Sequence, residues 1–207
     1  MTGESSAAAY QSWDEAYRSN NTPWDIGRPQ PAIVRISEWG GLVEPILDSG
    51  CGSGEHALFA ASSGLEGKGV DVAQAAIEHA RAKARARGLS VEFIVGDVLT
   101  LDEIPRLEPP FRTVMDIGCF HTFANADRPL YASSLASVTE TGAMLHLLCF
   151  SEQTPGTDGP RRVTQGEIAA TFSRDWYVDA IEAETFAVTN LWHGPTPSAW
   201  LARIIRR

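Results

Sequence analysis

The stretch Ile46-Leu47-Asp48-Ser49-Gly50-Cys51-Gly52-Ser53-Gly54-Glu55-His56 decides the fold of this 207-residue chain. An apolar run leads into it, three alternating glycines follow, and a helix-forming run comes next at 57–61. This order predicts a strand, a tight turn and a helix, because glycine adopts positive φ without steric cost. The free amides at the start of such a helix attract polar ligand groups, so the turn is a candidate binding loop.

The spacing of the glycines separates this turn from the dinucleotide fingerprint G-x-G-x-x-G. That fingerprint would place its third glycine at position 55, where the chain has Glu55 and instead carries Gly54. Asp48 also precedes the first glycine by two positions. A glycine-rich turn on its own is also compatible with a loop that binds nothing. Residues at the other predicted strand ends are therefore needed to decide whether the turn belongs to a ligand site.

Aspartates lie at or near the carboxyl ends of four successive predicted strands, and they are Asp48, Asp71, Asp97 and Asp116. Ligands of open α/β sheets bind at this edge. Asp71 follows Asp48 by 71 − 48 = 23 residues, which fits one strand–helix–strand unit. Carboxylates suit a ligand with two ribose hydroxyls, an exocyclic amine and an ammonium group, whereas they would repel a pyrophosphate. The acidic edge therefore favours a ligand of the first kind.

Strands and helices alternate along the chain, which predicts an α/β fold with a mostly parallel sheet and helices on both faces. Thr164 and Glu167 have the spacing of a capping box at the start of a helix. Residues 176–188 and 198–205 both alternate as strands, so they predict an antiparallel pair at one edge of a seven-stranded sheet. The other strands are expected at 46–48, 67–72, 91–95, 111–116 and 142–150, and helices at 32–39, 73–87, 129–139 and 164–172.

About 40 residues precede the first predicted strand. A helix is expected at 7–19, and the segment 23–31 contains Pro23, Pro29 and Pro31, which exclude a helix there. We expect residues 1–40 to form an N-terminal lid over the ligand site, within a single domain that spans 1–207.

The composition is that of a globular protein, with 43% apolar residues and a formal net charge of −9. The acidic balance argues against a nucleic-acid partner. The three cysteines show neither zinc spacing nor a disulfide pattern, and no metal site is predicted. Residues 1–9 lack the pattern of a signal peptide, and no apolar run reaches the length of a membrane span. We expect a cytoplasmic protein without a membrane partner, as a monomer or weak homodimer.

The chain resembles the class I S-adenosylmethionine-dependent methyltransferases over its whole length. More narrowly, Pro-Trp-Asp-Ile-Gly-Arg-Pro-Gln-Pro (23–31) together with the glycine turn at 47–56 resembles the thiopurine methyltransferase-like group. The runs at 118–123 and 159–163 resemble bacterial, especially mycobacterial, methyltransferases of heterocyclic toxins such as hydroxyquinolones. The resemblance implies methyl transfer from S-adenosyl-L-methionine to a hydroxyl, ring nitrogen or thiol of a small aromatic heterocycle, a toxin, xenobiotic or secondary metabolite. The alternatives are a halide or small-thiol methyltransferase and a non-catalytic cofactor-binding module.

The resemblance also implies a set of cofactor residues. Asp71 would bind the ribose, Asp97 and Val98 the adenine, and Trp24 would close over the methionine part, although Trp24 is also a natural packing anchor. The full set of expected cofactor residues is Trp24, Asp48, Gly50, Cys51, Gly52, Gly54, Asp71, Val72, Gly96, Asp97, Val98 and Asp116.

His121 follows the fourth predicted strand and is the candidate general base for a phenol or N-hydroxyl acceptor, because its ordinary pKa lies near neutrality. The alternative for His121 is a histidine bonded to the loop backbone or packed near the adenosine. Aromatic and basic side chains elsewhere would surround the acceptor. The expected substrate residues are Trp13, Arg28, Phe120, Phe123, Phe150, Arg161 and Trp192.

Overall fold

The computed structural model describes residues 12–156 and 159–207. Residues 12–18 are helical, so the described part of the helix expected at 7–19 is present, and residues 7–11 of that prediction lie outside the described residues. The long polar loop that follows the fifth strand includes 157–158, which also lie outside them.

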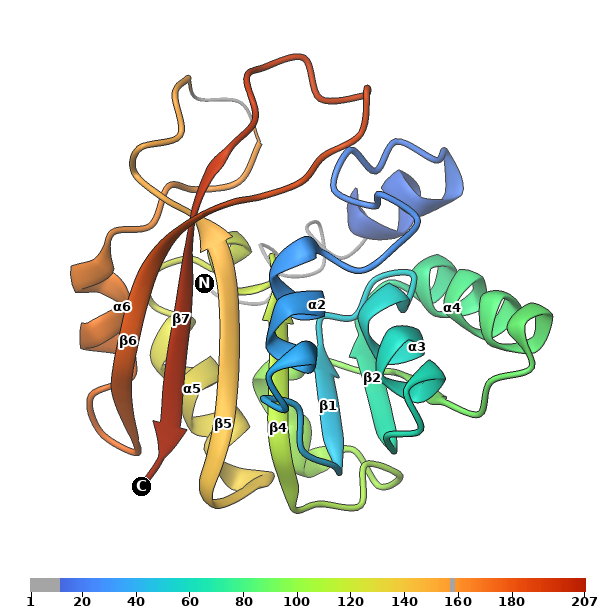
Figure 1. The fold of residues 1–207 in the computed structure, drawn as a ribbon, viewed down its shortest axis with the longest axis horizontal. Coiled ribbons are helices and arrows are strands. Elements are labelled where there is room, and N and C mark those ends of the chain that lie inside the picture. Colours follow the sequence, from blue (N-terminus) through green and yellow to red (C-terminus); the bar gives the residue numbers. More distant parts are fainter. Residues whose placement is uncertain (1–11, 157–158) are drawn as a thin grey trace.

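The seven strands form a single sheet in the order β3-β2-β1-β4-β5-β7-β6 (Figure 1). β7 runs antiparallel to both of its neighbours, and the other adjacent pairs are parallel. The sequence-based prediction of a mostly parallel sheet with one antiparallel C-terminal strand is confirmed. The strands are β1 (Ile46–Ser49), β2 (Gly67–Asp71), β3 (Glu92–Val95), β4 (Phe111–Ile117), β5 (Thr139–Phe150), β6 (Trp176–Thr185) and β7 (Ser198–Arg206).

Helices cover both faces of the sheet, as the alternation of elements predicted (Figure 1). α2, α3 and α4 pack on one face through buried side chains such as Ile33, Leu58 and Ile77. α5 and α6 pack on the other face through Tyr131 and Ile168. The helices are α2 (Pro31–Glu38), α3 (Glu55–Ser62), α4 (Gln74–Arg87), α5 (Arg128–Ser137) and α6 (Gln165–Thr171), with short 3-10 helices η1 (Val98–Glu103) and η2 (Phe120–Thr122).

Most helix and strand ends lie within two residues of the prediction, and the two largest differences are in β5 and β6. The capping box of α6 is present, because Thr164 accepts from the Glu167 amide and the Glu167 carboxylate accepts from the Thr164 amide. β5 begins at Thr139 and not at 142, since the strand continues through Gly142, which has φ +84°. β6 ends at Thr185 and not at 188, because the chain then turns toward the N-terminal segment.

The N-terminal segment, residues 12–30, lies over the carboxyl end of the sheet and touches segments remote in sequence. The Asp14 carboxylate accepts a hydrogen bond from the Ala75 amide at the start of α4, at 2.7 Å. The Gln30 side chain exchanges two hydrogen bonds with the backbone of Ala187, at 2.8 and 2.9 Å. This segment therefore bridges the two sides of the sheet edge where the expected site lies.

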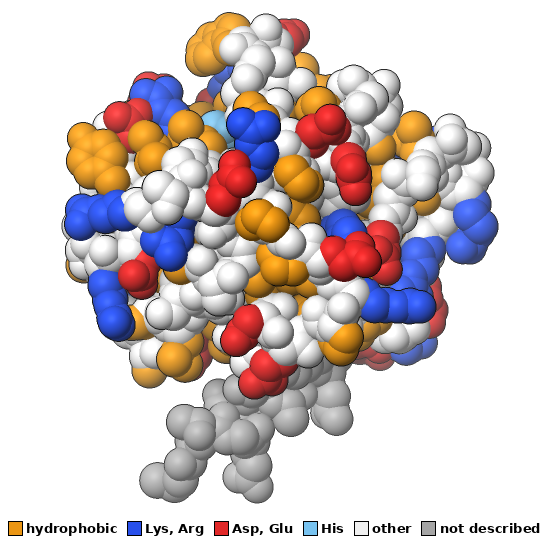
Figure 2. Space-filling model, turned by 90° about the horizontal axis from the view of Figure 1, so that it is seen from below, with side chains coloured by type: hydrophobic (Ala, Val, Ile, Leu, Met, Phe, Trp, Pro, Cys, Tyr) orange, Lys and Arg blue, Asp and Glu red, His pale blue; other side chains and the backbone are white. Residues whose placement is uncertain are grey.

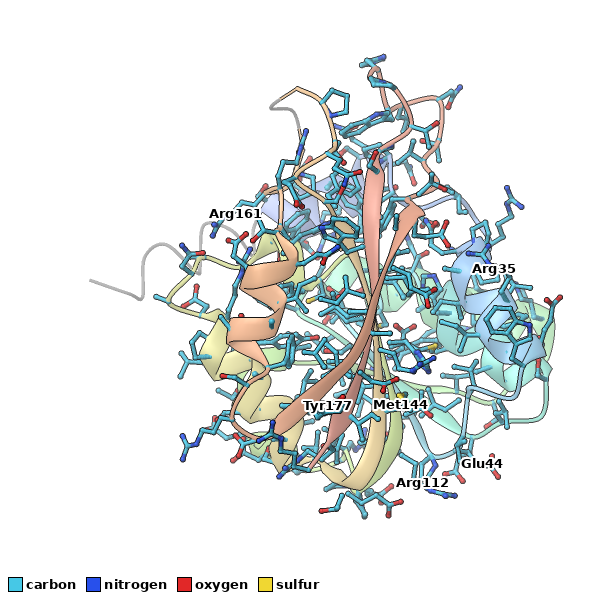
Figure 3. The ribbon with its side chains drawn as sticks, turned by 60° about the vertical axis from the view of Figure 1, so that its left-hand side comes forward. Arg35, Glu44, Arg112, Met144, Arg161 and Tyr177 are labelled. Atoms are coloured by element: carbon cyan, nitrogen blue, oxygen red, sulfur yellow. The ribbon has the colours of Figure 1, made fainter. Side chains whose placement is uncertain are left out.

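The opposite, amino-terminal end of the sheet carries interspersed acidic, basic and apolar side chains (Figure 2). Glu44 and Arg112 lie at that end, whereas Arg161 lies near the carboxyl end (Figure 3). Within 12–156 and 159–207, no helix is both long and apolar enough to cross a membrane.

Candidate active site

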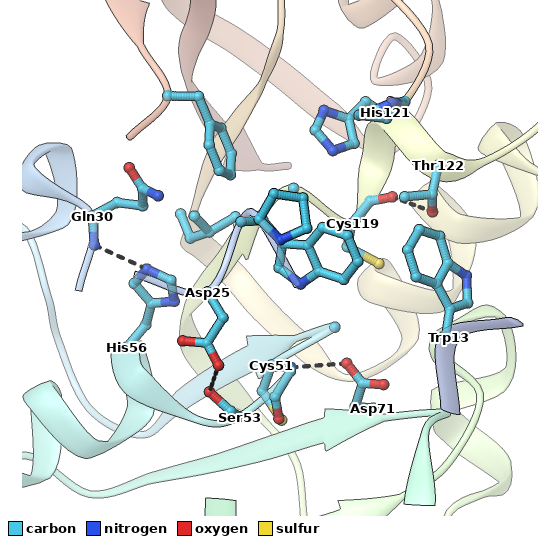
Figure 4. A pocket seen from close by; sticks show the side chains of 18 of the residues that line it. Trp13, Asp25, Gln30, Cys51, Ser53, His56, Asp71, Cys119, His121 and Thr122 are labelled. Atoms are coloured by element: carbon cyan, nitrogen blue, oxygen red, sulfur yellow. Dashed lines mark hydrogen bonds between the residues drawn. The ribbon is translucent and has the colours of Figure 1, made fainter. Parts of the chain in front are cut away.

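A cavity of about 490 Å³ opens at the carboxyl edge of the sheet, beneath the N-terminal segment (Figure 4). Its lining comes from the ends of β1, β2 and β4 and from the loops that follow β3, β5 and β6. One region, called here the acidic part, contains the glycine turn with Asp71 and Asp97. The adjoining region, called the aromatic part, contains Phe150, Phe186 and Trp192.

The glycine turn has the geometry that its sequence requires. Gly50 and Gly52 have φ values of +70° and +53°, which residues with a side chain rarely adopt. A Cβ at Gly52 would lie 2.3 Å from the Tyr17 hydroxyl, so the backbone must be bare there. Gly54 has another use, because a Cβ there would lie 2.6 Å from the Phe93 ring. The third glycine thus permits close packing of α3 and does not line the cavity.

Asp71 is the carboxylate most closely tied to the turn. Its Oδ2 accepts a hydrogen bond from the Gly52 amide and its Oδ1 accepts one from the Ala73 amide, each at 2.8 Å. Burial raises the pKa of Asp71, and the bonds from the Ala73 and Gly52 amides oppose that shift. Each oxygen keeps a further lone pair for a donor in the cavity. Asp71 can therefore orient two hydroxyl donors while it holds the turn in place.

Asp97 and Val98 line the cavity just beyond β3, together with Val72 beyond β2. The Oδ1 of Asp97 accepts from the Leu99 amide at 2.9 Å, which fixes the carboxyl at the start of η1. Gly96, also expected near the ligand, does not line the cavity, because it packs against Ile104. This corner offers an acceptor beside apolar side chains, as a flat ring with an exocyclic amine requires.

Asp48 and Asp116 do not line the cavity, so the expectation that all four strand-end acids face a ligand has to be corrected. Asp48 is 1% exposed and accepts from the Ala57 amide at 3.0 Å. Asp116 is fully buried and accepts from the Tyr131 hydroxyl at 2.7 Å and from the amides that begin η2. Both acids stabilise turns beneath the site. Burial raises the pKa of Asp48 to about 7 and that of Asp116 to about 6.

The raised pKa of Asp48 predicts a pH-dependent stability. The folded protein retains this proton up to about pH 7, whereas the unfolded chain releases it near pH 3.8. The contribution of Asp48 to the free energy of unfolding therefore falls, by up to about 4 kcal/mol, as the pH rises through that window. Asp48→Asn removes this effect. The free energy of unfolding, measured in urea between about pH 4 and 7, should fall in wild type relative to the variant as the pH rises. A difference between the two proteins that stays constant with pH would contradict this prediction.

Aromatic side chains of the N-terminal segment close the cavity over the glycine turn. The Trp24 indole donates to the Tyr17 hydroxyl at 3.0 Å, and the Trp13 and Trp24 rings meet edge to face at 5.5 Å between centroids. Asp25 accepts from the Ser53 hydroxyl at 2.5 Å and lies 3.7 Å from Lys83. Trp13 and Trp24 line the cavity as expected, and Trp24 is also the packing anchor that the sequence allowed.

The aromatic part gathers rings from the end of β5 and from the loops that follow β4 and β6. Phe150 packs edge to face against Phe186 and Trp192, with centroids 5.3 and 5.6 Å apart. Phe123 also lines the cavity. Phe120 does not, since it is fully buried in the core against Tyr131 and Phe172, so its expected contact with the substrate is corrected.

His121 lines the aromatic part but is 4% exposed. Its Nδ1 accepts a hydrogen bond from the Phe150 amide at 2.9 Å, so the ring proton resides on Nε2. Burial, with the nearby Arg162 and Arg128 guanidinium groups, lowers the pKa of His121 to about 3. The ring thus has no free basic nitrogen. The geometry favours the alternative role, a histidine bonded to the loop backbone, over a general base.

Arg28 and Arg161 both line the cavity, and both are exposed. Arg161 donates a 3.3 Å hydrogen bond to the Phe123 carbonyl and lies 3.6 Å from the Glu167 carboxylate. Its neighbour Arg162 is occupied by loop carbonyls, including that of Pro160 at 2.6 Å. Two cationic groups are therefore available at the mouth of the cavity.

Several lining residues were not singled out by the sequence. Gln30 donates its backbone amide to the His56 Nε2 at 3.2 Å, and this contact joins the N-terminal segment to α3. Tyr17 lies within the helix expected at 7–19, but nothing in the local sequence shows that its hydroxyl would lie against Gly52. Phe186 lies just after β6, where only the pairing of remote strands brings it over the cavity. The remaining lining residues of this kind are Pro23, Asp25, Ile26, Ser53, Glu55, Ile117, Gly118, Cys119, Thr122, Gly159, Pro160 and Val188.

The chain is similar to proteins of known class. A family described as "Methyltransferase domain" matches residues 46–142. A 2-heptyl-1-hydroxyquinolin-4(1H)-one methyltransferase of Mycobacteroides abscessus is 34% identical over 161 residues, which cover 77% of this chain and 70% of that protein. A solved structure described as "Conversion of a Disulfide Bond into a Thioacetal Group during Echinomycin Biosynthesis" matches with a TM-score of 0.86 and 30% identity, covering 96% and 93% of the two chains.

The fold is shared more widely. The 1,6-didemethyltoxoflavin-N1-methyltransferase of Burkholderia thailandensis, solved with 1,6-didemethyltoxoflavin and S-adenosylhomocysteine, matches with a TM-score of 0.78. The match covers 100% of this chain and 91% of that one at 16% identity, so it speaks for the architecture alone.

Proposed function

Because this chain belongs to the class I S-adenosylmethionine-dependent methyltransferases, we propose that it methylates a hydroxyl, ring nitrogen or thiol of a small aromatic heterocycle. The observation that carries the proposal is one cavity in which an acidic part with a glycine turn adjoins an aromatic part. Such a cavity suits two ligands held end to end, a nucleoside-type methyl donor and a flat acceptor.

The acidic part fits S-adenosylmethionine by its chemistry. Asp71 would accept from the two ribose hydroxyls, and Asp97 would accept from the adenine amine with Val98 along the ring. Gly50 and Gly52 leave the backbone bare where the donor would lie. The ring cluster of Trp13, Tyr17 and Trp24 would cover it, with residues 12–40 acting as a lid; residues 1–11 of the expected lid lie outside the described residues. A pyrophosphate ligand fits poorly, because Asp71 and Asp97 would both repel it.

The aromatic part supports a flat acceptor. Phe150, Phe186 and Trp192 present rings from different directions, and such rings favour stacked or edge contacts with another aromatic ring. A bare halide would leave most of this surface without a partner, so a heterocycle is the better occupant. The acceptor would be a toxin, xenobiotic or secondary metabolite, in line with the hydroxyquinolone named for the Mycobacteroides abscessus relative.

The chemistry asks little of the protein beyond alignment. The methyl group of S-adenosylmethionine is already activated by the positive sulfur when the donor is bound. The cavity walls have to hold the acceptor atom in line with the methyl carbon and exclude water.

The test is an acceptor screen with purified protein and S-adenosylmethionine, read by release of S-adenosylhomocysteine. The panel contains N-hydroxyquinolones, hydroxyquinolines, heteroaromatic thiols, thiocyanate and iodide. Turnover with the ring compounds and none with iodide supports the proposal. Turnover confined to halide or thiocyanate would identify the alternative enzyme, and tight donor binding without transfer to any acceptor would identify a binding module.

A further inference from the structure

Outside Asp71 and Asp97, the proton acceptors that line the cavity are occupied, starting with the two histidines. His121 uses Nδ1 to accept from the Phe150 amide, and His56 uses Nε2 to accept from the Gln30 amide. Burial is the main cause that lowers the pKa of His56, to about 4, and that of His121, to about 3. Neither ring can therefore remove a proton from a bound acceptor near neutral pH.

The two lining carboxylates beside the glycine turn other than Asp71 and Asp97 are paired in the same way. Asp25 accepts from Ser53 at 2.5 Å and lies beside Lys83. Glu55 is 5% exposed and is held by Lys83 at 2.7 Å and by Arg87 at 2.9 Å. The other lining carboxylates belong to the acidic part. Within 12–156 and 159–207, the aromatic part thus has no unoccupied base.

The cavity as a whole is lined by two exposed cationic groups, Arg28 and Arg161. Arg28 is exposed at the cavity and makes no hydrogen bond or ion pair with the rest of the described chain. Arg161 is a second guanidinium at the cavity, but it donates to the Phe123 carbonyl and lies 3.6 Å from the Glu167 carboxylate, so Arg28 is the better candidate. Guanidinium groups bind anionic oxygen or sulfur with paired N–H donors and remain charged at every pH of interest.

We infer that the acceptor enters as an anion, an ionised N-hydroxyl, hydroxyl or thiol on a flat ring, and that Arg28 recognises its charge. This inference rests on the proposed function. The acceptor anion attacks the methyl carbon, the new bond to carbon forms as the carbon–sulfur bond breaks, and the electron pair returns to sulfur. Sulfur becomes a neutral thioether, the product is neutral, and no proton has to be moved by the protein.

The first experiment measures kcat/KM against pH for two N-hydroxy heterocycles that share one ring and differ in a substituent that changes their acidity. The expected result is a rise of kcat/KM with pH whose midpoint equals the pKa of each acceptor. The two midpoints should therefore differ as the acceptors do. A common midpoint for both acceptors would overturn the inference, and so would a midpoint that moves in His121→Asn. Asp158, in the segment between β5 and α6, lies outside the described residues, so Asp158→Asn is measured as well, and a midpoint that moves in that variant would also overturn the inference.

The second experiment tests Arg28. Arg28→Gln should raise KM for the anionic acceptor at least about tenfold, the size expected for one charged hydrogen bond. KM for a neutral heteroaromatic amine and the calorimetric affinity for S-adenosylmethionine should change less than about threefold. Arg85→Gln is the matched control, because it removes the same charge from the exposed face of α4, away from the cavity.

The outcomes separate the two proposals. If ring acceptors are methylated but the pH midpoint is fixed by the protein, the inference fails while the proposed function stands. If Arg28→Gln weakens donor binding instead, Arg28 holds the cofactor and not the acceptor. If no acceptor is methylated at any pH, the proposed function fails and the inference with it.

Discussion

Asp71→Ala is expected to weaken binding of S-adenosylmethionine at least about 100-fold, because two hydrogen bonds to a charged carboxylate are lost at about 1.5–3 kcal/mol each. Asp71 already accepts from the Gly52 and Ala73 amides, which aim its free lone pairs into the cavity. The measurement is isothermal titration calorimetry with S-adenosylmethionine and with S-adenosylhomocysteine.

Two controls separate contact from misfolding in the Asp71 experiment. Asp102→Ala removes an exposed aspartate from η1, outside the cavity, and should leave the affinity unchanged. The 2′-deoxy analogue of S-adenosylhomocysteine should bind wild type more weakly than the parent compound does. Asp71→Ala should bind the analogue and the parent compound with the same affinity. If the variant still discriminates between the two ligands as wild type does, the carboxylate does not hold the ribose.

The acidic edge could be predicted from the sequence because parallel strands end at one edge of a sheet. The prediction was wrong for Asp48 and Asp116, and the reason is where each acid stands relative to the end of its strand. Asp71 is the last residue of β2, and Asp97 lies beyond the end of β3, so both project past the sheet. Asp48 and Asp116 each stand one residue inside their strands. Asp48 is flanked there by Gly69 and Met115, so its carboxyl stays in the interior.

The aromatic part shows why an acceptor site is harder to predict. Phe120 and Phe123 belong to the same short run, yet Phe120 enters the core and Phe123 lines the cavity, because η2 turns the chain between them. Phe186 reaches the cavity only through the pairing of β6 with β7 and of β7 with β5. Local sequence patterns predict the glycine turn and the helix caps, whereas the contacts of the aromatic rings at the cavity depend on the order of the strands in the sheet.

Gly52→Ala is expected to weaken binding of S-adenosylmethionine at least about 30-fold. The left-handed backbone at Gly52 costs an alanine about 1–2 kcal/mol. The new Cβ would also lie 2.3 Å from the Tyr17 hydroxyl, which has to move. Tyr17 is 6% exposed and accepts the Trp24 hydrogen bond, so its displacement would carry the aromatic cover away from the glycine turn.

The position of the Tyr17 hydroxyl makes this prediction testable as a coupling. Tyr17→Phe removes the clashing oxygen, while the ring carbon behind it would remain 3.4 Å from the new Cβ. If the two residues acted independently, the fold-loss of donor affinity in Tyr17→Phe/Gly52→Ala would equal the product of the two single fold-losses. We expect the loss in the double variant to be about tenfold smaller than that product, because residues in contact are energetically coupled. Gly64→Ala is the matched control, because Gly64 has φ +82° with open space around its Cβ position. It should reduce thermal stability and leave donor affinity unchanged. If the loss of donor affinity in the double variant equals the product of the two single losses, backbone strain alone, and not the Tyr17 contact, determines the effect of a side chain at Gly52.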